Sequence, residues 1–111
     1  MIEKVILDYL EDELDIPCFM EVPQNPPAVF IVIEKTSAGR ENYIDSCTLA
    51  IQSYAESLYS AASLSEAVKT AMYDSITLDE VASCRLNSEY NFTDPRMKQY
   101  RYQAVFDLTH Y

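Results

Sequence analysis

Glycine and histidine are each present only once in this chain of 111 residues, and tryptophan is absent. The Walker loop and the dinucleotide-binding fingerprint both need several glycines where the backbone approaches phosphate. A single glycine, Gly39, therefore excludes both nucleotide-binding motifs. The single histidine, His110, is the penultimate residue, and chain ends tend to fray. Because a hydrolytic triad needs a base held beside its nucleophile, we expect no catalytic residues in this chain.

Basic residues are also scarce, at 8 against 18 acidic residues, which gives a formal net charge of -10. A surface of this charge repels phosphate, so we expect no sequence-specific binding of DNA or RNA. No apolar run approaches the roughly 20 residues of a membrane span. The amino-terminal residues Met1 to Lys4 include an acid where a signal peptide has basic residues. We therefore expect no membrane partner and a cytoplasm-like compartment.

The three cysteines, Cys18, Cys47 and Cys84, are widely spaced and form no C-x-x-C pair. This spacing predicts neither a disulfide framework nor a zinc site. Pairing any of these thiols with His110 would give a nucleophile and a base, but packing as small buried hydrophobes is the interpretation we favour.

Acidic residues gather near the amino terminus, where they could bind a hard cation or supply paired carboxylates. The alternating carboxylates and glycine of a calcium loop are missing, so we expect a solvated helix face that could also meet a basic partner. We expect no metal and no cofactor. The residues in this group are Asp8, Glu11, Asp12, Glu13 and Asp15.

Hydrophobic periodicity predicts one α+β domain over residues 1–111, in the order α-β-β-β-α-β-β. Spacings of three and four predict a helix over 2–14, ended by Pro17. Ser63-Leu64-Ser65-Glu66 has the form of a capping box and predicts a second helix reaching Asp74. Strands are predicted over 18–22, 28–33, 43–55, 82–90 and 100–109, the last two joined by a turn over 91–99. We expect a mostly antiparallel sheet with both helices packed on one face.

The segment 28–33 is continuously apolar, which is typical of a strand covered on both faces. One face could lie on the helices and the other on a neighbouring subunit. The following segment 36–42 is polar and contains Gly39, which predicts a hairpin loop. In the strand over 82–90, alternation places Tyr90 on the face of Cys84 and Leu86, and Glu89 on the opposite face.

Tyrosine is abundant, with nine residues, and three of them lie near the last predicted hairpin. Tyrosine suits half-buried strands and also subunit interfaces, so both core packing and subunit contact remain open. An exposed Arg-Glu pair in a loop adds little stability, so it is either incidental or part of a contact in an assembly. Our candidate interface residues are Arg40, Glu41, Tyr90, Arg96, Tyr100 and Tyr102.

Over its whole length the chain resembles the tail terminator proteins of long-tailed bacteriophages, also called tail completion or tail-to-head joining proteins. The resemblance rests on the element order, on the Pro26-Pro27 pair before the apolar strand, and on the closing stretch Tyr-Arg-Tyr-Gln-Ala-Val-Phe-Asp over 100–107.

This resemblance implies a structural virion protein that forms a ring, typically of six subunits. Such a ring caps the major tail tube protein, ends tube polymerisation and presents the surface that the head-tail connector proteins join. Viral DNA then passes through the lumen without sequence-specific binding, and an acidic lumen favours its sliding. The protein would be made in the bacterial cytoplasm and end at the head-proximal end of the virion tail. The resemblance carries over no catalytic, cofactor-binding or metal-binding residues.

Three other functions remain open. A connector or neck ring at the head-tail joint would have similar size and charge. A tail tube or baseplate subunit is less favoured, because a tube protein should polymerise into long stacks. A small acidic adaptor could instead bind a basic host protein through the carboxylates of the first helix. An enzyme is the most distant of the alternatives.

Overall fold

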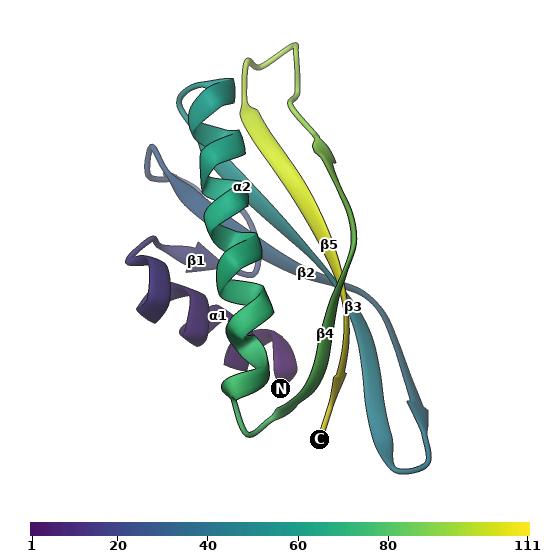
Figure 1. Cartoon of the computed structure of the whole chain (residues 1–111). Coiled ribbons are helices and arrows are strands. Elements are labelled where there is room, and N and C mark those ends of the chain that lie inside the picture. Colours follow the sequence, from purple (N-terminus) through teal and green to yellow (C-terminus); the bar gives the residue numbers. More distant parts are fainter.

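Five strands form one sheet in the spatial order β1-β2-β3-β5-β4, with two helices against one face, in a computed structural model that describes all 111 residues (Figure 1). Only β1 and β2 are parallel; the other three pairings are antiparallel. These features confirm the predicted fold class and element order. The elements are α1 (Ile2–Leu14), β1 (Cys18–Phe19), β2 (Phe30–Glu41), β3 (Ile44–Ala55), α2 (Leu58–Tyr73), a 3₁₀ turn (Asp74–Thr77), β4 (Val81–Asn91) and β5 (Tyr100–His110). The predicted strand over 18–22 is thus shortened to two residues.

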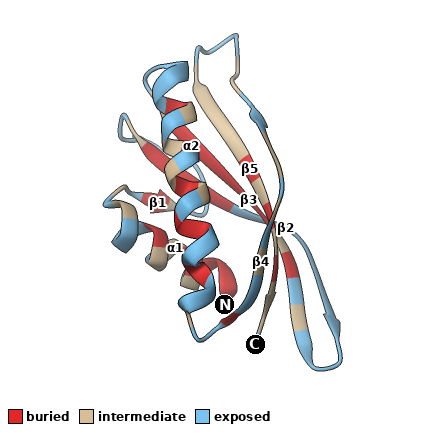
Figure 2. Cartoon of the chain, in the orientation of Figure 1, coloured by how far each residue is buried: buried red, intermediate tan, exposed pale blue.

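The main core lies between the helices and the sheet, where red segments of α1 and α2 face red segments of the strands (Figure 2). Ile6 and Leu10 of α1 are fully buried, as are Val68 and Met72 of α2. The hydroxyl of Tyr9 donates to the carbonyl of Ala71 at 2.6 Å and so ties the two helices together. Strand residues in this core are Ile31, Ile33, Cys47, Leu49, Ile51, Ala104, Phe106 and Leu108.

The second face of β2 is covered by the chain itself, so the suggestion that a neighbouring subunit covers it is wrong. Phe30 and Val32 point away from the helices, yet they are only 3% and 5% exposed. Phe30 stacks on Tyr54 with ring centroids 4.3 Å apart, and Phe19 meets it edge-on at 6.0 Å. Aromatic side chains from three adjacent strands therefore form a small second core on the open face.

The predicted hairpin loop over 36–42 is also wrong, because β2 continues through it to Glu41. The turn consists of only Asn42 and Tyr43, and Glu41 pairs with Ile44. This end of the hairpin projects beyond both helices (Figure 1). A strand surrounded by solvent needs polar residues on both faces, and that polarity resembles a loop. Gly39 is a strand residue, where a Cβ would approach Ser46 Oγ to 3.2 Å.

Helix α2 begins five residues before the predicted capping box. The N-cap is Ser57, whose hydroxyl accepts from the amide of Ser60 at 3.1 Å. Ser65 instead lies buried within the helix and donates to Glu89 Oε2 at 2.5 Å. Glu66 pairs with Lys69 at 2.7 Å. The residues of the apparent capping box thus make contacts in the body of the helix.

A bulge in β4 reverses the predicted faces at the end of that strand. Leu86 pairs with Phe106 and Ser88 with Val105, so Asn87 is an additional residue. An extra residue shifts every later side chain to the opposite face. Glu89 therefore faces α2, and Tyr90 lies on the open face of the sheet.

Candidate functional site

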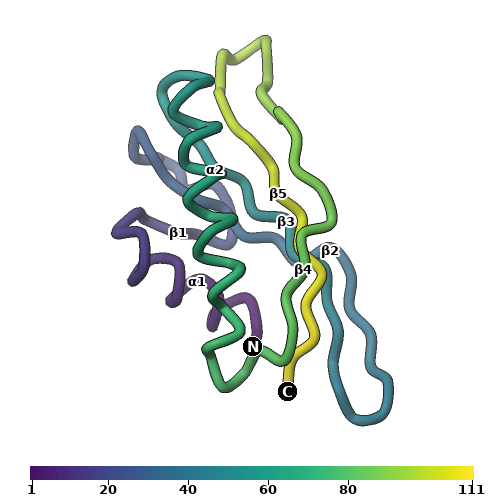
Figure 3. The backbone as a smooth tube through the Cα atoms, viewed as in Figure 1, coloured from purple at the N-terminus to yellow at the C-terminus, as the bar shows by residue number.

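Two hairpins extend from opposite ends of the sheet, and they contain all six candidate interface residues. In Figure 3 the β2–β3 turn lies at the bottom right and the segment joining β4 to β5 lies at the top. The register agrees, because Asp45 of β3 pairs with His110 while Ala55 pairs with Tyr100. The molecule is 44 Å long and about 25 Å across. Arg40 and Glu41 are thus separated from the other candidates by most of its length.

The β2–β3 tip ends in an exposed tyrosine that sequence reasoning missed. Tyr43 is 93% exposed and has a φ of 67°, and its neighbour Asn42 has a φ of 53°. Two positive φ values in a two-residue loop define a type I′ turn, which usually takes glycine at its second position. Asn42 was the available signal, because asparagine favours the first position of this turn.

Charges at the β2–β3 tip are only partly balanced. Arg40 Nε lies 2.8 Å from Asp45 Oδ1, so its expected partner, the adjacent Glu41, is not the one it binds. Glu41 takes part in no ion pair. The tip therefore presents a free carboxylate beside an exposed aromatic ring.

The β4–β5 end carries the other four candidates, but on different faces of the sheet. Tyr90 lies on the open face, where its hydroxyl is hydrogen-bonded to Gln103. Tyr100 and Tyr102 are half-buried and share the face of Ala104, which packs under α2. Arg96 lies in the exposed turn between the strands, where its amide donates to Asp94 Oδ1 at 3.0 Å. The three tyrosines are therefore neighbours along the chain but do not form one surface.

A chain of hydrogen bonds crosses the open face next to this hairpin. Arg101 Nη1 donates to the Tyr54 hydroxyl at 3.0 Å, and that hydroxyl donates to Gln52 Oε1 at 3.1 Å. Gln52 Nε2 then donates to Gln103 Oε1 at 2.8 Å. The Arg101 guanidinium also lies 4.4 Å from the Phe92 ring centroid, a cation–π geometry. This network fixes the second aromatic core relative to the hairpin.

A small groove of about 250 Å³ lies between the proline-rich segment before β2 and the β4–β5 turn. It is lined by Pro26, Pro27 and Met97, and it borders the stacked rings of Phe30 and Tyr54, which are almost fully buried. Lys98 lies at its rim and has a φ of 49°. The Met97 side chain is exposed although it is apolar.

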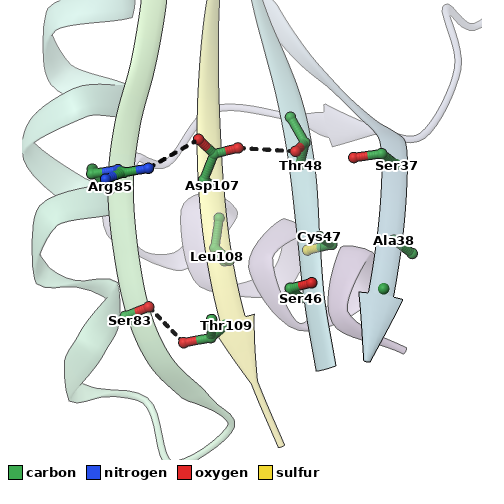
Figure 4. A pocket seen from close by; sticks show the side chains of 11 residues that line it. Ser37, Ala38, Ser46, Cys47, Thr48, Ser83, Arg85, Asp107, Leu108 and Thr109 are labelled. Carbon is green, nitrogen blue, oxygen red and sulfur yellow. Dashed lines mark hydrogen bonds and ion pairs between the residues drawn. The ribbon is translucent and has the colours of Figure 1, made fainter. Parts of the chain in front are cut away.

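A hollow of about 550 Å³ lies on the open face near the β2–β3 end (Figure 4). Asp107 is central to it and accepts from Thr48 Oγ1 at 2.9 Å and from Asn87 Nδ2 at 3.1 Å. Arg85 lies 3.8 Å from the same carboxylate. Through these contacts Asp107 of β5 links β3 to β4.

The three thiols are packed in or against the main core, as the sequence predicted. Burial raises the pKa of Cys18 to about 12 and that of Cys47 to about 11. Burial also raises the pKa of Cys84. The His110 ring forms its one hydrogen bond with the carbonyl of Tyr111 at 3.4 Å. The structure therefore brings no thiolate and imidazole together.

The five acidic residues of the predicted group, which lie in α1 and at its C-cap, are exposed, and all but Glu13 line a shallow hollow with Ile16 and Pro17. Asp8 pairs with Lys4 at 2.6 Å, and Glu11 accepts from the amide of Cys18 at 3.0 Å. No group of three or more His, Cys, Asp or Glu side chains is arranged to hold a metal ion.

Comparison with known protein families and with curated proteins found no match to this chain. Neither helix is long and apolar enough to cross a membrane.

Proposed function

We propose that this chain is a ring-forming tail terminator of a long-tailed bacteriophage. In this function it would cap the tail tube, end tube polymerisation and provide the surface that joins the head. The proposal comes from the resemblance over the whole chain, including the closing stretch over 100–107.

The observation that supports it best is the pair of dissimilar hairpin tips at opposite ends of one sheet (Figure 3). A ring is built from heterologous contacts, in which one surface of a subunit meets a different surface of its neighbour. A molecule 44 Å long with distinct ends has the form that such a contact needs. The net charge of -10 also suits a lumen through which DNA slides.

Light scattering on a sizing column tests this function, first alone across concentration and salt, then mixed with tail tube protein from the same source. We expect a mass near six subunits, or a complex that forms with tube protein. Binding to a portal or adaptor in place of tube protein would identify a connector ring. The proposal would be overturned if the chain stayed monomeric in every condition and did not bind tube protein.

The exposed carboxylates of α1 favour one rival function, an adaptor for a basic protein. Such binding would involve a single copy of this chain and would weaken steeply with salt, because exposed charges are screened. Salt-sensitive binding of a monomer to a basic protein would therefore favour the adaptor over the ring.

A further inference from the structure

The type I′ turn places Tyr43 at a position that usually takes glycine, and the Tyr43 side chain makes no hydrogen bond or aromatic contact within its own chain that would offset the cost. Its φ of 67° lies in the left-handed region, where a side chain is disfavoured and glycine is the usual residue. The ring is 93% exposed and makes no hydrogen bond or aromatic contact in the structure. Strained residues of this kind cluster at binding sites. The turn therefore presents Tyr43 to something outside the chain.

The groove at the other end has the size and chemistry to receive a tyrosine side chain. Its volume of about 250 Å³ is below the range of about 300 to 1,000 Å³ that is usual for small-molecule sites. Phe30 and Tyr54 border it but are only 3% and 2% exposed, so an inserted ring would contact mainly Pro26, Pro27 and Met97. Met97, which is exposed at the wall, is an adaptable side chain suited to covering an inserted ring.

Charge complementarity points to a second copy of this chain as the source of that tyrosine. Arg96 and Lys98, beside the groove, take part in no ion pair, although acidic residues outnumber basic ones by more than two to one. Glu41, beside Tyr43, is also unpaired. A docked tip would bring this free carboxylate toward the free cations.

We propose that copies of this chain associate head to tail, with Tyr43 of one copy inserted into the groove between Pro26-Pro27 and Met97 of the next. The contact is heterologous, so it generates a ring where the rotation between copies closes. This inference rests on the proposed ring function and specifies the contact that would build it.

Sedimentation equilibrium of Tyr43→Ala tests the aromatic contact. A central aromatic anchor contributes enough that its removal should weaken association by about tenfold or more. Tyr73→Ala is the matched control, because Tyr73 is 51% exposed at the C-terminal end of α2 and belongs to neither hairpin nor to the groove lining. Circular dichroism confirms that each variant is folded. Equal association by the two variants would refute the tyrosine contact.

Charge-reversal variants test whether Glu41 of one copy lies near Lys98 of the next. Glu41→Lys and Lys98→Glu should each weaken association, and combining the two changes in one chain should restore it. If the double variant instead associates more weakly than either single variant, the two residues do not pair across the contact.

Cross-linking tests the geometry. Under mild oxidation, a Tyr43→Cys chain mixed with a Met97→Cys chain should form a mixed disulfide dimer, while the wild-type chain, whose thiols are buried or half-buried, should not. A tube-capping ring without this cross-link and insensitive to Tyr43→Ala would overturn the inference and leave the proposed function standing. A cross-linked assembly that does not bind tube protein would support the contact and overturn the proposed function. A wild-type chain that stays monomeric in every condition would overturn both.

Discussion

Replacing Tyr43 by glycine should make the chain more stable while removing its most exposed aromatic ring. A non-glycine residue in the left-handed region costs about 1 to 2 kcal/mol, and the φ of Tyr43 is 67°. Glycine loses about 0.5 to 1 kcal/mol more backbone entropy on folding, which offsets part of that gain. Because the ring is 93% exposed, its removal sacrifices little packing. The net expectation is a gain of about 0.5 to 1 kcal/mol.

For a domain of this size, such a gain corresponds to a rise in Tm of roughly 2 to 5 °C, measured by circular dichroism on the dissociated chain. Tyr43→Ala is the control, because alanine removes the ring but retains the Cβ that makes this conformation unfavourable. We expect its Tm to stay near the wild-type value. A Tm for the glycine variant at or below that of the alanine variant would refute the reasoning, since backbone strain would then not decide the stability of the turn.

Two further predictions concern the folded chain itself. Lys69→Met should lower stability by about 1 to 2 kcal/mol, because the half-buried Glu89 carboxylate loses a charged donor at 2.9 Å. The same change at the exposed Lys4 should leave the urea midpoint unchanged, and equal losses at both sites would contradict this account. Stability should also fall above about pH 8.5, because the unfolded chain then ionises thiols that burial keeps protonated, with pKa values of about 12 for Cys18 and about 11 for Cys47. Between about pH 8.5 and its folded-state pKa, each thiol lowers the free energy of unfolding by about 1.4 kcal/mol per pH unit. The Cys18→Ala variant should therefore lose less stability than the wild type from pH 8 to pH 10. Parallel plots of stability against pH for the two proteins would be contrary evidence.

Elements with a strict period were predictable from the sequence. Helix α1 ends at Leu14, followed by Asp15 in a left-handed C-cap, because Pro17 prevents its continuation. Strand β5 has the expected limits within one residue, since residues on its two faces alternate in polarity from Tyr100 to Thr109 with Val105 as the one exception. Both elements lie beside the main core, where burial imposes the pattern.

Strands β3 and β4 were also predicted within one residue at each end, but other features of the fold depend on contacts that local patterns do not encode. The outer half of β2 is polar because no helix covers it, and only its pairing with β3 makes it a strand. Ser63 resembles an N-cap, but the buried Ala61 extends the helix back to Ser57. The exposure of the Tyr43 side chain could not be predicted, because it depends on which two residues form the turn. The pairing register of the two strands decides that.

The distribution of charge explains why association would be confined to the hairpin tips. Two chains of net charge -10 repel one another at long range, so most orientations of approach are unfavourable. Five of the eight basic residues are already paired with acids of the same chain. Arg101 is bound to neutral groups, which leaves only Arg96 and Lys98 to attract a second copy. Both lie in the β4–β5 turn, and the free Glu41 lies at the opposite end. Because Arg96 and Lys98 have no acidic partner within the chain, end-to-end contact is the orientation in which a second copy would meet unpaired cations, as the proposed ring requires.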